Sequence, residues 1–300
     1  MLWLPIIVSA YFIFAVNNLI DNFLLLGPPN PKSYSFYVGT LGILVLLLIP
    51  FVNFSVPETN QIILALVAGV LYVLALFSLF YSLEYYEPSR VVPAIGAILP
   101  LCTFGLVYFF SNEEVFLGIK EILAFSALIL GSFLISFSKK QKISFQSFKI
   151  AALAGFLFSL TFFLSKYVYL AQPFWSGFIW MRIGSFLAGI CFLITKEVRE
   201  EIFQRKFTFE KKTGALFLLN QGAGAGGFIL QNFAISLAGL IYLPFINALQ
   251  GLQYVFLFLL VFFLTKKFPR ISEEKFTKEI IIQKGVSIGL IVLGLIIFYF

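Results

Sequence analysis

Gln61 to Tyr81 reads QIILALVAGVLYVLALFSLFY, 21 residues without a charged side chain. About 20 consecutive apolar residues are needed to cross the roughly 30 Å hydrocarbon core of a bilayer as an α-helix. A helix also satisfies its own backbone hydrogen bonds in lipid, where no water can do so. This stretch therefore predicts a transmembrane helix.

Nine further apolar runs surround it, separated by Pro, Gly, Asn or clusters of charge. The expected helices are Leu2–Leu26, Tyr34–Phe51, Gln61–Tyr81, Val91–Phe110, Val115–Phe137, Phe148–Leu170, Phe174–Thr195, Gly214–Leu237, Leu240–Leu264 and Ile280–Phe300. The alternating pattern of a membrane barrel is not seen, and no stretch is left over for a soluble domain. The sequence therefore predicts an all-α integral membrane protein with ten transmembrane helices.

The composition supports this fold class and excludes several kinds of enzyme. Of the 300 residues, 60% are hydrophobic and 12% are charged, whereas soluble domains are about half apolar and a quarter charged. There is no histidine, which excludes a His-centred triad and an H-E-x-x-H zinc site. Cys102 and Cys191 stand far apart in apolar runs, and no G-x-S-x-G elbow is present. We therefore expect no enzyme activity, no metal and no cofactor.

The basic residues predict the orientation in the membrane. The loops after spans one, three, five, seven and nine, with the adjoining helix ends, hold 18 of the 21 Lys and Arg residues. The positive-inside rule places such loops in the cytoplasm, which would put both termini on the outer side of a plasma (inner) membrane. These clusters are expected to contact anionic lipids, and no nucleic-acid partner is expected.

A weak internal repeat relates the two halves of the chain. Ser9–Phe14 (SAYFIF) aligns with Ala154–Ser159 (AGFLFS) at a shift of 145, and Val91–Ile95 (VVPAI) aligns with Tyr242–Ile246 (YLPFI) at a shift of 151. Each half then holds five spans. Because five is odd, the two copies would lie upside down relative to each other, an arrangement that many secondary transporters share.

This repeat predicts two units joined by a short basic segment. The first repeat is expected at residues 1–138, the basic linker loop at 139–147 and the second repeat at 148–300.

Polar side chains inside spans are costly in lipid and are candidates for function. In the first span, Asn17, Asn18 and Asp21 share one helix face with Tyr11 within an arc of about 140°. Asp21 could bind substrate or exchange a proton. The alternative is that Asp21 lies at the helix end, where it is solvated or paired with Lys32.

Lys166 and Arg182 are the basic residues well inside spans, and either could neutralise a carboxylate or phosphate on a substrate. Lys166 could instead extend its amine to the membrane interface. Inverted repeats would separate Asp21 from Lys166 by roughly 15–20 Å, which favours two half-sites over a salt bridge.

Spans eight and nine contribute side chains that suit a polar or zwitterionic ligand. They are Asn220, Gln221, Asn247, Gln250, Gln253 and Tyr254. Hydrogen bonding between helices is the alternative for most of them. The glycine-rich run 222–227 lacks the ending of a phosphate loop, so we expect close helix packing through Gly222 and Gly226.

Three prolines inside spans are expected to kink or locally open their helices and to act in gating. They are Pro93 and Pro100 in span four and Pro244 in span nine.

Several short motifs resemble the EamA domain of the drug/metabolite transporter superfamily. In the first half these are Ser82-Leu83, Pro88–Val92, Leu99-Pro100, Glu113-Glu114 and Ala127–Gly131. In the second half, Arg182 resembles the Arg that opens the family's second helix, and Lys284–Gly294 resembles its closing helix. The sequence departs from the family pattern at Leu99 and Asn112, where Glu and Gly are usual.

The resemblance implies a ten-helix basket that exports or exchanges small metabolites such as amino acids, or drugs, without ATP. We expect a monomer in the lipid bilayer, with a central cavity lined by spans one, three, four, six, eight and nine, and protons as a further partner if Asp21 couples transport. Members of the family are often drawn with cytoplasmic termini, contrary to the charge count. Alternatives are a lipid-linked sugar or phospholipid flippase, an intramembrane enzyme, and a non-transporting scaffold with a dry centre.

Overall fold

The computed structural model describes residues 1–24, 30–86, 88–111, 118–136, 145–204, 211–267 and 278–299. Every regular element within these ranges is a helix, and none of these residues lies in a strand. The α-helices are α1 (Trp3–Leu24), α2 (Pro31–Leu41), α3 (Thr59–Tyr85), α4 (Pro88–Phe110), α5 (Ile119–Ser136), α6 (Phe145–Ala171), α7 (Phe174–Cys191), α8 (Lys196–Gln204), α9 (Lys211–Leu237), α10 (Leu243–Ala248), α11 (Gly251–Lys267) and α12 (Lys278–Tyr299). Short 3₁₀ segments are η1 (Gly42–Phe51), η2 (Phe192–Ile194) and η3 (Leu240–Tyr242).

Eight segments of the described chain are long and apolar enough to cross a membrane. They are Trp3–Ile20, Pro31–Phe51, Thr59–Tyr85, Val91–Phe110, Phe148–Ala171, Phe174–Ile194, Leu240–Leu264 and Glu279–Tyr299. Each falls on one of the predicted spans, whereas α5 and α9, which fall on the other two, are not among them. The prediction of an all-α protein with several membrane-crossing helices is therefore confirmed.

The structure corrects the predicted helices in three places. The second span is not one α-helix, because α2 gives way to the 3₁₀ segment η1, which contains Pro50. The ninth span is divided into η3, α10 and α11. The loop after span seven contains the nine-residue helix α8, which was not expected. In addition, α6 begins at Phe145, inside the segment predicted as a linker.

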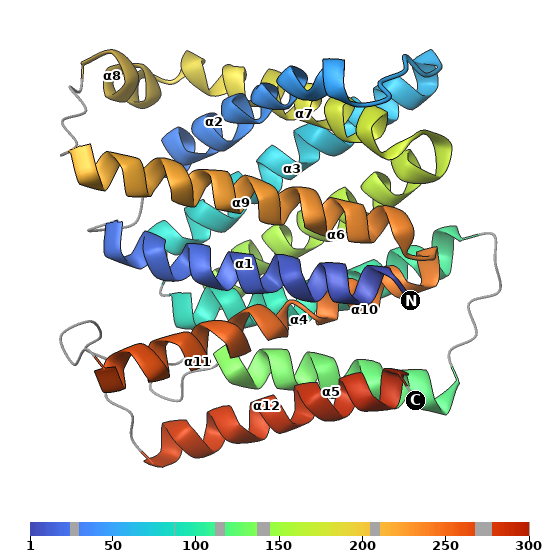
Figure 1. The fold of residues 1–300 in the computed structure, drawn as a ribbon, viewed down its shortest axis with the longest axis vertical. Helices are drawn as coiled ribbons and strands as arrows, with labels where there is room; N and C mark the ends of the chain where they lie inside the picture. Colours follow the sequence, from blue (N-terminus) through green and yellow to red (C-terminus); the bar gives the residue numbers. More distant parts are fainter. Residues whose placement is uncertain are drawn as a thin grey trace.

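The long helices run side by side across the view in Figure 1, and both chain ends lie at the same end of the bundle. Near these ends, the rings of Trp3 and Phe298 are 5.9 Å apart. The short helix α8 lies at the opposite end, together with the C-terminal ends of α1 and α11. The loops predicted to be basic follow α1, α3, α5, α7 and α11, so the described helix ends that flank them gather away from the termini.

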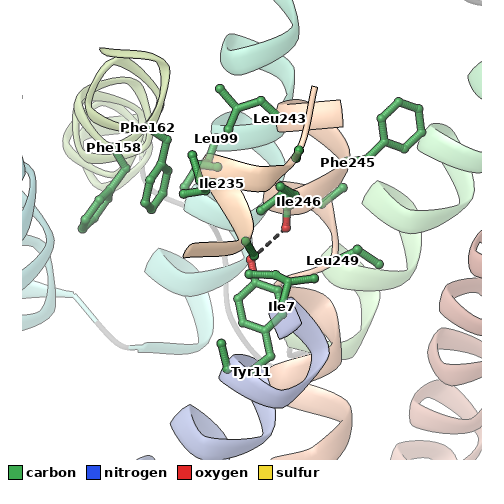
Figure 2. Packing of buried hydrophobic residues seen from close by; sticks show 14 of the residues in the cluster. Ile7, Tyr11, Leu99, Phe158, Phe162, Ile235, Leu243, Phe245, Ile246 and Leu249 are labelled. Carbon is green, nitrogen blue, oxygen red and sulfur yellow. Dashed lines mark hydrogen bonds between the residues drawn. The ribbon is translucent and has the colours of Figure 1, made fainter. Parts of the chain in front are cut away.

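The break between α10 and α11 frees backbone carbonyls that a continuous helix would have used. The Gln250 amide donates to the Asn247 carbonyl at 3.2 Å instead of to Ile246, one residue further back. The Tyr11 hydroxyl of α1 donates to the Ile246 carbonyl at 2.8 Å (Figure 2). Ser132 of α5 donates in the same way to Ala248, at 2.9 Å. The broken helix is therefore held by side chains from two neighbours.

Replacing Tyr11 with phenylalanine is expected to lower the free energy of unfolding by about 1 kcal/mol. The hydroxyl is fully buried, and its loss would leave the Ile246 carbonyl without that donor in an apolar core. Denaturant unfolding of the purified protein in detergent measures the change. Tyr167→Phe is the matched control, because its hydroxyl bonds the Phe110 carbonyl at an exposed position. Equal losses in the two variants would contradict the role assigned to Tyr11.

Candidate functional site: a hollow beside Arg182

A small hollow lies among α3, α6, α7 and α9. Its lining residues are Ala68, Gly69, Tyr72, Thr161, Phe162, Ser165, Phe178, Met181, Arg182, Ser185, Phe228 and Asn232. The empty space is about 290 Å³ when its open part is included. Its room for water is about 10 Å³, which suffices for about one molecule. The hollow is thus narrow and largely filled by its own aromatic walls.

Arg182 is the charged residue of this lining, and it is 92% buried. Its guanidinium carbon lies 3.9 Å from the ring centre of Phe228, 4.9 Å from that of Tyr72 and 5.4 Å from that of Phe178. Tyr72 also hydrogen-bonds to it through its side chain. No carboxylate of the described residues pairs with Arg182. The site therefore contains a buried positive charge that aromatic rings hold without neutralising it.

Close packing of α3 against α7 fixes the position of Arg182. Gly69 and Gly184 stand where the two helices meet, and a Cβ at either position would collide with the backbone of the other helix. The Ser185 hydroxyl lies 3.1 Å from the Gly69 carbonyl across the same contact. Small residues that let helices approach are typical of membrane interfaces. They bring Arg182, three residues before Ser185, against the ring of Tyr72 on α3.

Hydrogen bonds from two further helices hold the opposite wall. The Tyr169 hydroxyl of α6 donates to the Asn232 side-chain oxygen at 2.9 Å, and the Asn232 amide donates to the Phe228 carbonyl at 3.0 Å. These contacts fix α9 beside α6 and keep the Phe228 ring against Arg182.

Lys166 lies outside this hollow, although it is also buried. Its amine donates to the carbonyl of Ser236 at 3.0 Å, in the last turn of α9. Carbonyls in the last turn have no partner within their own helix, and a cation there is favoured by the helix dipole. Lys166 thus supplies a hydrogen-bond donor to a backbone carbonyl at the C-terminal end of α9. Ser236 is eight residues beyond Phe228, which is about 12 Å along the helix.

The predicted residues of span nine form a second polar group, separate from the hollow. The Asn247 amide donates to the Thr103 hydroxyl oxygen at 2.8 Å, and Ser159 lies 3.1 Å from that oxygen. The Asn247 side-chain oxygen is buried and has no hydrogen-bond partner among the described residues. Gln253 is buried, while Gln250 and Tyr254 are half-buried. Tyr11 and Ser132 already donate to the freed carbonyls of Ile246 and Ala248 in this part of the fold.

Of the predicted residues of the first span, Asn17 contacts α9. The Asn220 amide donates to the backbone carbonyl of Asn17 at 3.3 Å. Asn18 and Gln221 are half-buried. Asp21 lies in α1, but its side chain is outside the described residues, so its predicted role stays a prediction.

The glycine-rich run of α9 does allow close packing, but not through the predicted pair. A Cβ at Gly227 would be 2.9 Å from the Phe14 ring, and one at Gly224 would be 3.2 Å from the Asn17 side chain. Gly222 and Gly226 have no described atom within 4 Å of such a Cβ. The helix presents Gly224 and Gly227 to α1 because three residues nearly complete one turn.

The prolines do not interrupt their helices as strongly as expected. Pro93 and Pro100 lie inside α4, which is one helix from Pro88 to Phe110. Pro244 stands in the first turn of α10, where a missing amide hydrogen is tolerated, and the break follows at Leu249 and Gln250. Their part in gating remains a prediction.

Lys32, at the start of α2, pairs with Glu197 of α8. Its amine is 2.9 Å from the carboxylate, which links the start of α2 to α8. This hydrogen bond lowers the pKa of Glu197, and both side chains are exposed, so the pair is expected to add little stability. The alternative pairing of Lys32 with Asp21 involves a side chain outside the described residues and stays a prediction.

Among the predicted site residues that the structure describes, Arg182 is the one that lines the hollow. The described lining residues of this hollow come from α3, α6, α7 and α9, and none of them comes from α1, α4 or α11. Sequence reasoning missed the ring partners Tyr72, Phe178 and Phe228, which come from three separate helices. The lining residues Thr161 and Ser165 could have been found from the sequence, because they are polar, four residues apart and therefore on the same face of α6.

Comparison with known proteins gives a match in fold only. No family model and no curated protein matches the chain. A solved structure described as "Crystal structure of protein" is similar over 98% of this chain and 95% of its own, with a TM-score of 0.68 and 14% sequence identity. The whole chain is therefore similar in fold to a protein of known structure.

Proposed function

We propose that this protein is a secondary membrane transporter that exports or exchanges small metabolites, such as amino acids or amphipathic drug-like compounds. The observation that carries this proposal is the buried guanidinium of Arg182, which borders a hollow and has no described carboxylate partner. Ionisable groups inside membrane bundles are expensive and commonly mark substrate pathways. In a non-transporting scaffold we would instead expect a dry centre in which each charged side chain is paired with a neighbour.

The pairing of helices supports ten spans arranged as two inverted EamA-like repeats. The helices α1 to α5 fall on spans one to five, and α6, α7, α9, α11 and α12 fall on spans six to ten. If each span corresponds to the span five places later, the contact of α3 with α6 corresponds to that of α9 with α1. In the same way, the contact of α4 with α6 corresponds to that of α11 with α1. The contacts of α2 with α7 and of α5 with α12 join corresponding spans. All of these pairs are in contact, as expected for two copies around an axis in the membrane plane.

One difference between the halves supports alternating access. The helices α3 and α7 pack extensively, whereas their counterparts α9 and α2 are not among the pairs in substantial contact. Transporters with inverted repeats expose a central site to one side and then the other when the two halves exchange arrangements.

The remaining parts of the proposal come from the sequence. The transporter is a monomer in the plasma (inner) membrane, with its basic loops in the cytoplasm and both termini outside. Asp21 on α1 is proposed to couple transport to protons, since a carboxylate in a membrane span can take up and release a proton.

Uptake into proteoliposomes tests the proposal. The full chain is reconstituted and offered a panel of amino acids and amphipathic compounds, with and without a pH gradient. At least one compound is expected to accumulate, and Asp21→Asn is expected to remove the effect of the gradient. Glu197→Gln is the matched control, because Glu197 is exposed and lies outside the spans.

Two results would count against the proposal. If folded protein moves nothing in the panel, the protein is not this kind of transporter. If Asp21→Asn keeps the full response to the pH gradient, Asp21 does not couple transport.

A further inference from the structure

We infer that the hollow beside Arg182 binds a single halide ion, such as chloride, as the counter-ion of the guanidinium. The inference follows from the buried charge, the hydrogen-bond donors around it and the small size of the hollow. It goes beyond the proposed function, because an anion site of this kind does not depend on transport. In a transporter, an anionic substrate would have to displace the halide before it could pair with Arg182.

The guanidinium of Arg182 is a buried charge with donors to spare. Among the described residues of the lining, Arg182 is the one that is ionised at neutral pH. A guanidinium offers several N–H donors, whereas the Tyr72 hydroxyl is the one described group that hydrogen-bonds to it. The rings of Phe178 and Phe228 attract the cation but carry no net charge. Because an unpaired charge in an apolar interior is costly, an anion that pairs with Arg182 is favoured.

Tyr72 supplies a second donor to the same space. A guanidinium can only donate hydrogen bonds, so the Tyr72 oxygen accepts the bond from Arg182. The hydrogen of the Tyr72 hydroxyl has no acceptor among the described residues and is left to donate to a ligand. Arg182 on α7 and Tyr72 on α3 therefore both present donors to the hollow, as an anion requires.

Three further hydroxyls of the lining can turn toward an anion. Thr161 and Ser165 each donate at 2.8 Å to the carbonyl four residues back in α6, and Ser185 does so at 3.1 Å in α7. In an α-helix each of these carbonyls also accepts the backbone amide four residues on. A hydroxyl can therefore rotate away from it without leaving that carbonyl unsatisfied.

A water molecule is the alternative occupant of this space. It could accept from Arg182 and donate to the oxygens of Thr161 and Ser165. It would leave the guanidinium without a negative partner, however, and so would not offset the cost of burying the charge. The charge therefore favours an anion over water.

The size of the hollow selects an anion of a single atom. The hollow has room for about one water molecule between the rings of Phe162, Phe178 and Phe228. A halide is the kind of anion closest to that size, and the open part of the hollow gives it a way in. Carboxylates, phosphates and sulfates are several atoms across, so they do not fit unless the walls move apart.

The melting temperature of the purified full-length protein in detergent tests the inference without any transport step. Sodium chloride, bromide, acetate and gluconate are compared at equal ionic strength, with gluconate as the reference because it is too large for the hollow. An ion that binds only the folded state raises the melting temperature. Chloride and bromide at about 100 mM are expected to raise it by at least about 2 °C over gluconate. Acetate is expected to stay within about 1 °C of gluconate, because it does not fit.

Two variants assign the effect to the hollow. Arg182→Met is expected to lose the response to chloride, measured against the same variant in gluconate. The double variant Thr161→Val with Ser165→Ala keeps the charge but removes two donors whose present bonds stay within α6, so the fold is expected to persist. Its half-saturating chloride concentration is expected to rise at least about threefold.

Each variant has a matched control that should respond to chloride as the wild type does. Lys166→Met is the control for Arg182→Met, because Lys166 is also a buried basic side chain but lies outside the hollow. Ser287→Ala is the control for the double variant, because Ser287 is buried and bonded within its own helix but lies on α12, away from the hollow.

The inference fails if chloride has no more effect than gluconate, if acetate acts as strongly as chloride, or if Arg182→Met responds to chloride as the wild type does. It also fails if the double variant binds chloride as tightly as the wild type, a result that can be obtained even where Arg182→Met does not fold. Transport is measured separately in proteoliposomes. Transport of a metabolite by a protein without a chloride response would overturn the inference and leave the proposed function standing. The expected chloride response, in a protein that moves no compound of the panel, would overturn the proposed function and keep the halide site.

Discussion

Replacing Gly184 with alanine is expected to lower the free energy of unfolding by about 3 kcal/mol, and replacing Gly69 is expected to do the same. A Cβ at Gly184 would lie 2.7 Å from the Cα and 2.8 Å from the carbonyl carbon of Leu66. A Cβ at Gly69 would lie 2.7 Å from the amide nitrogen of Ser185. These are backbone atoms of the facing helix, which cannot rotate away as a side chain could. The variants must therefore separate α3 from α7.

Thermal and denaturant unfolding in detergent measure the loss, with size-exclusion profiles to detect aggregation. The matched controls are Gly96→Ala and Gly105→Ala on α4, where no described atom lies within 4 Å of the added carbon. Alanine favours a helix over glycine by about 1 kcal/mol, so these controls are expected to be neutral or more stable. If all four variants behave alike, the close approach of α3 and α7 does not stabilise the fold. Because this contact also positions Arg182, the Gly184 variant should lose ligand binding even where it stays folded.

The helices could be predicted from the sequence because the apolar runs have the length that a bilayer demands. The breaks could not be placed. Pro244 pointed to a disturbance in span nine, yet the turn at Leu249 and Gln250 comes later, since a proline in a first turn does no harm there. The turn is held by Tyr11 and Ser132, from helices far away in the sequence. A sequence read one span at a time cannot supply such partners.

The candidate site shows the same limit. Arg182 stood out because a basic residue inside a span is rare, and it does border the hollow. The three rings around Arg182 (Tyr72, Phe178 and Phe228; here called the aromatic cage) were not predicted. Aromatic residues are 19% of the chain, and most of them are expected to pack helices or face lipid. The choice of Tyr72 and Phe228 depends on which helix faces touch, and small residues such as Gly69 decide that. A charge inside a span can thus be recognised in the sequence, whereas its surroundings require the fold.

Arg182→Met and Lys166→Met are expected to change stability in opposite directions. Arg182 has no described carboxylate partner, so its burial carries a desolvation cost that an apolar side chain of similar size would not have. The melting temperature of the Arg182→Met variant is therefore expected to rise. Its transport rate is expected to fall at least about tenfold, because the substrate loses a charge-assisted hydrogen bond. Lys166→Met leaves the Ser236 carbonyl without its donor, which should lower the free energy of unfolding by about 1 kcal/mol.

The pair is informative because both residues are buried basic side chains inside membrane helices. Melting temperatures in detergent and initial transport rates in proteoliposomes are measured for both variants, with reconstitution corrected for folded protein. Lys166→Met is expected to keep most of its transport. If Arg182→Met instead destabilises the protein as much as Lys166→Met and loses transport only in proportion to unfolding, then the aromatic cage is a structural contact. If Arg182 costs stability and is also needed for transport, it meets the expectation for a substrate site, in which the substrate supplies the counter-charge.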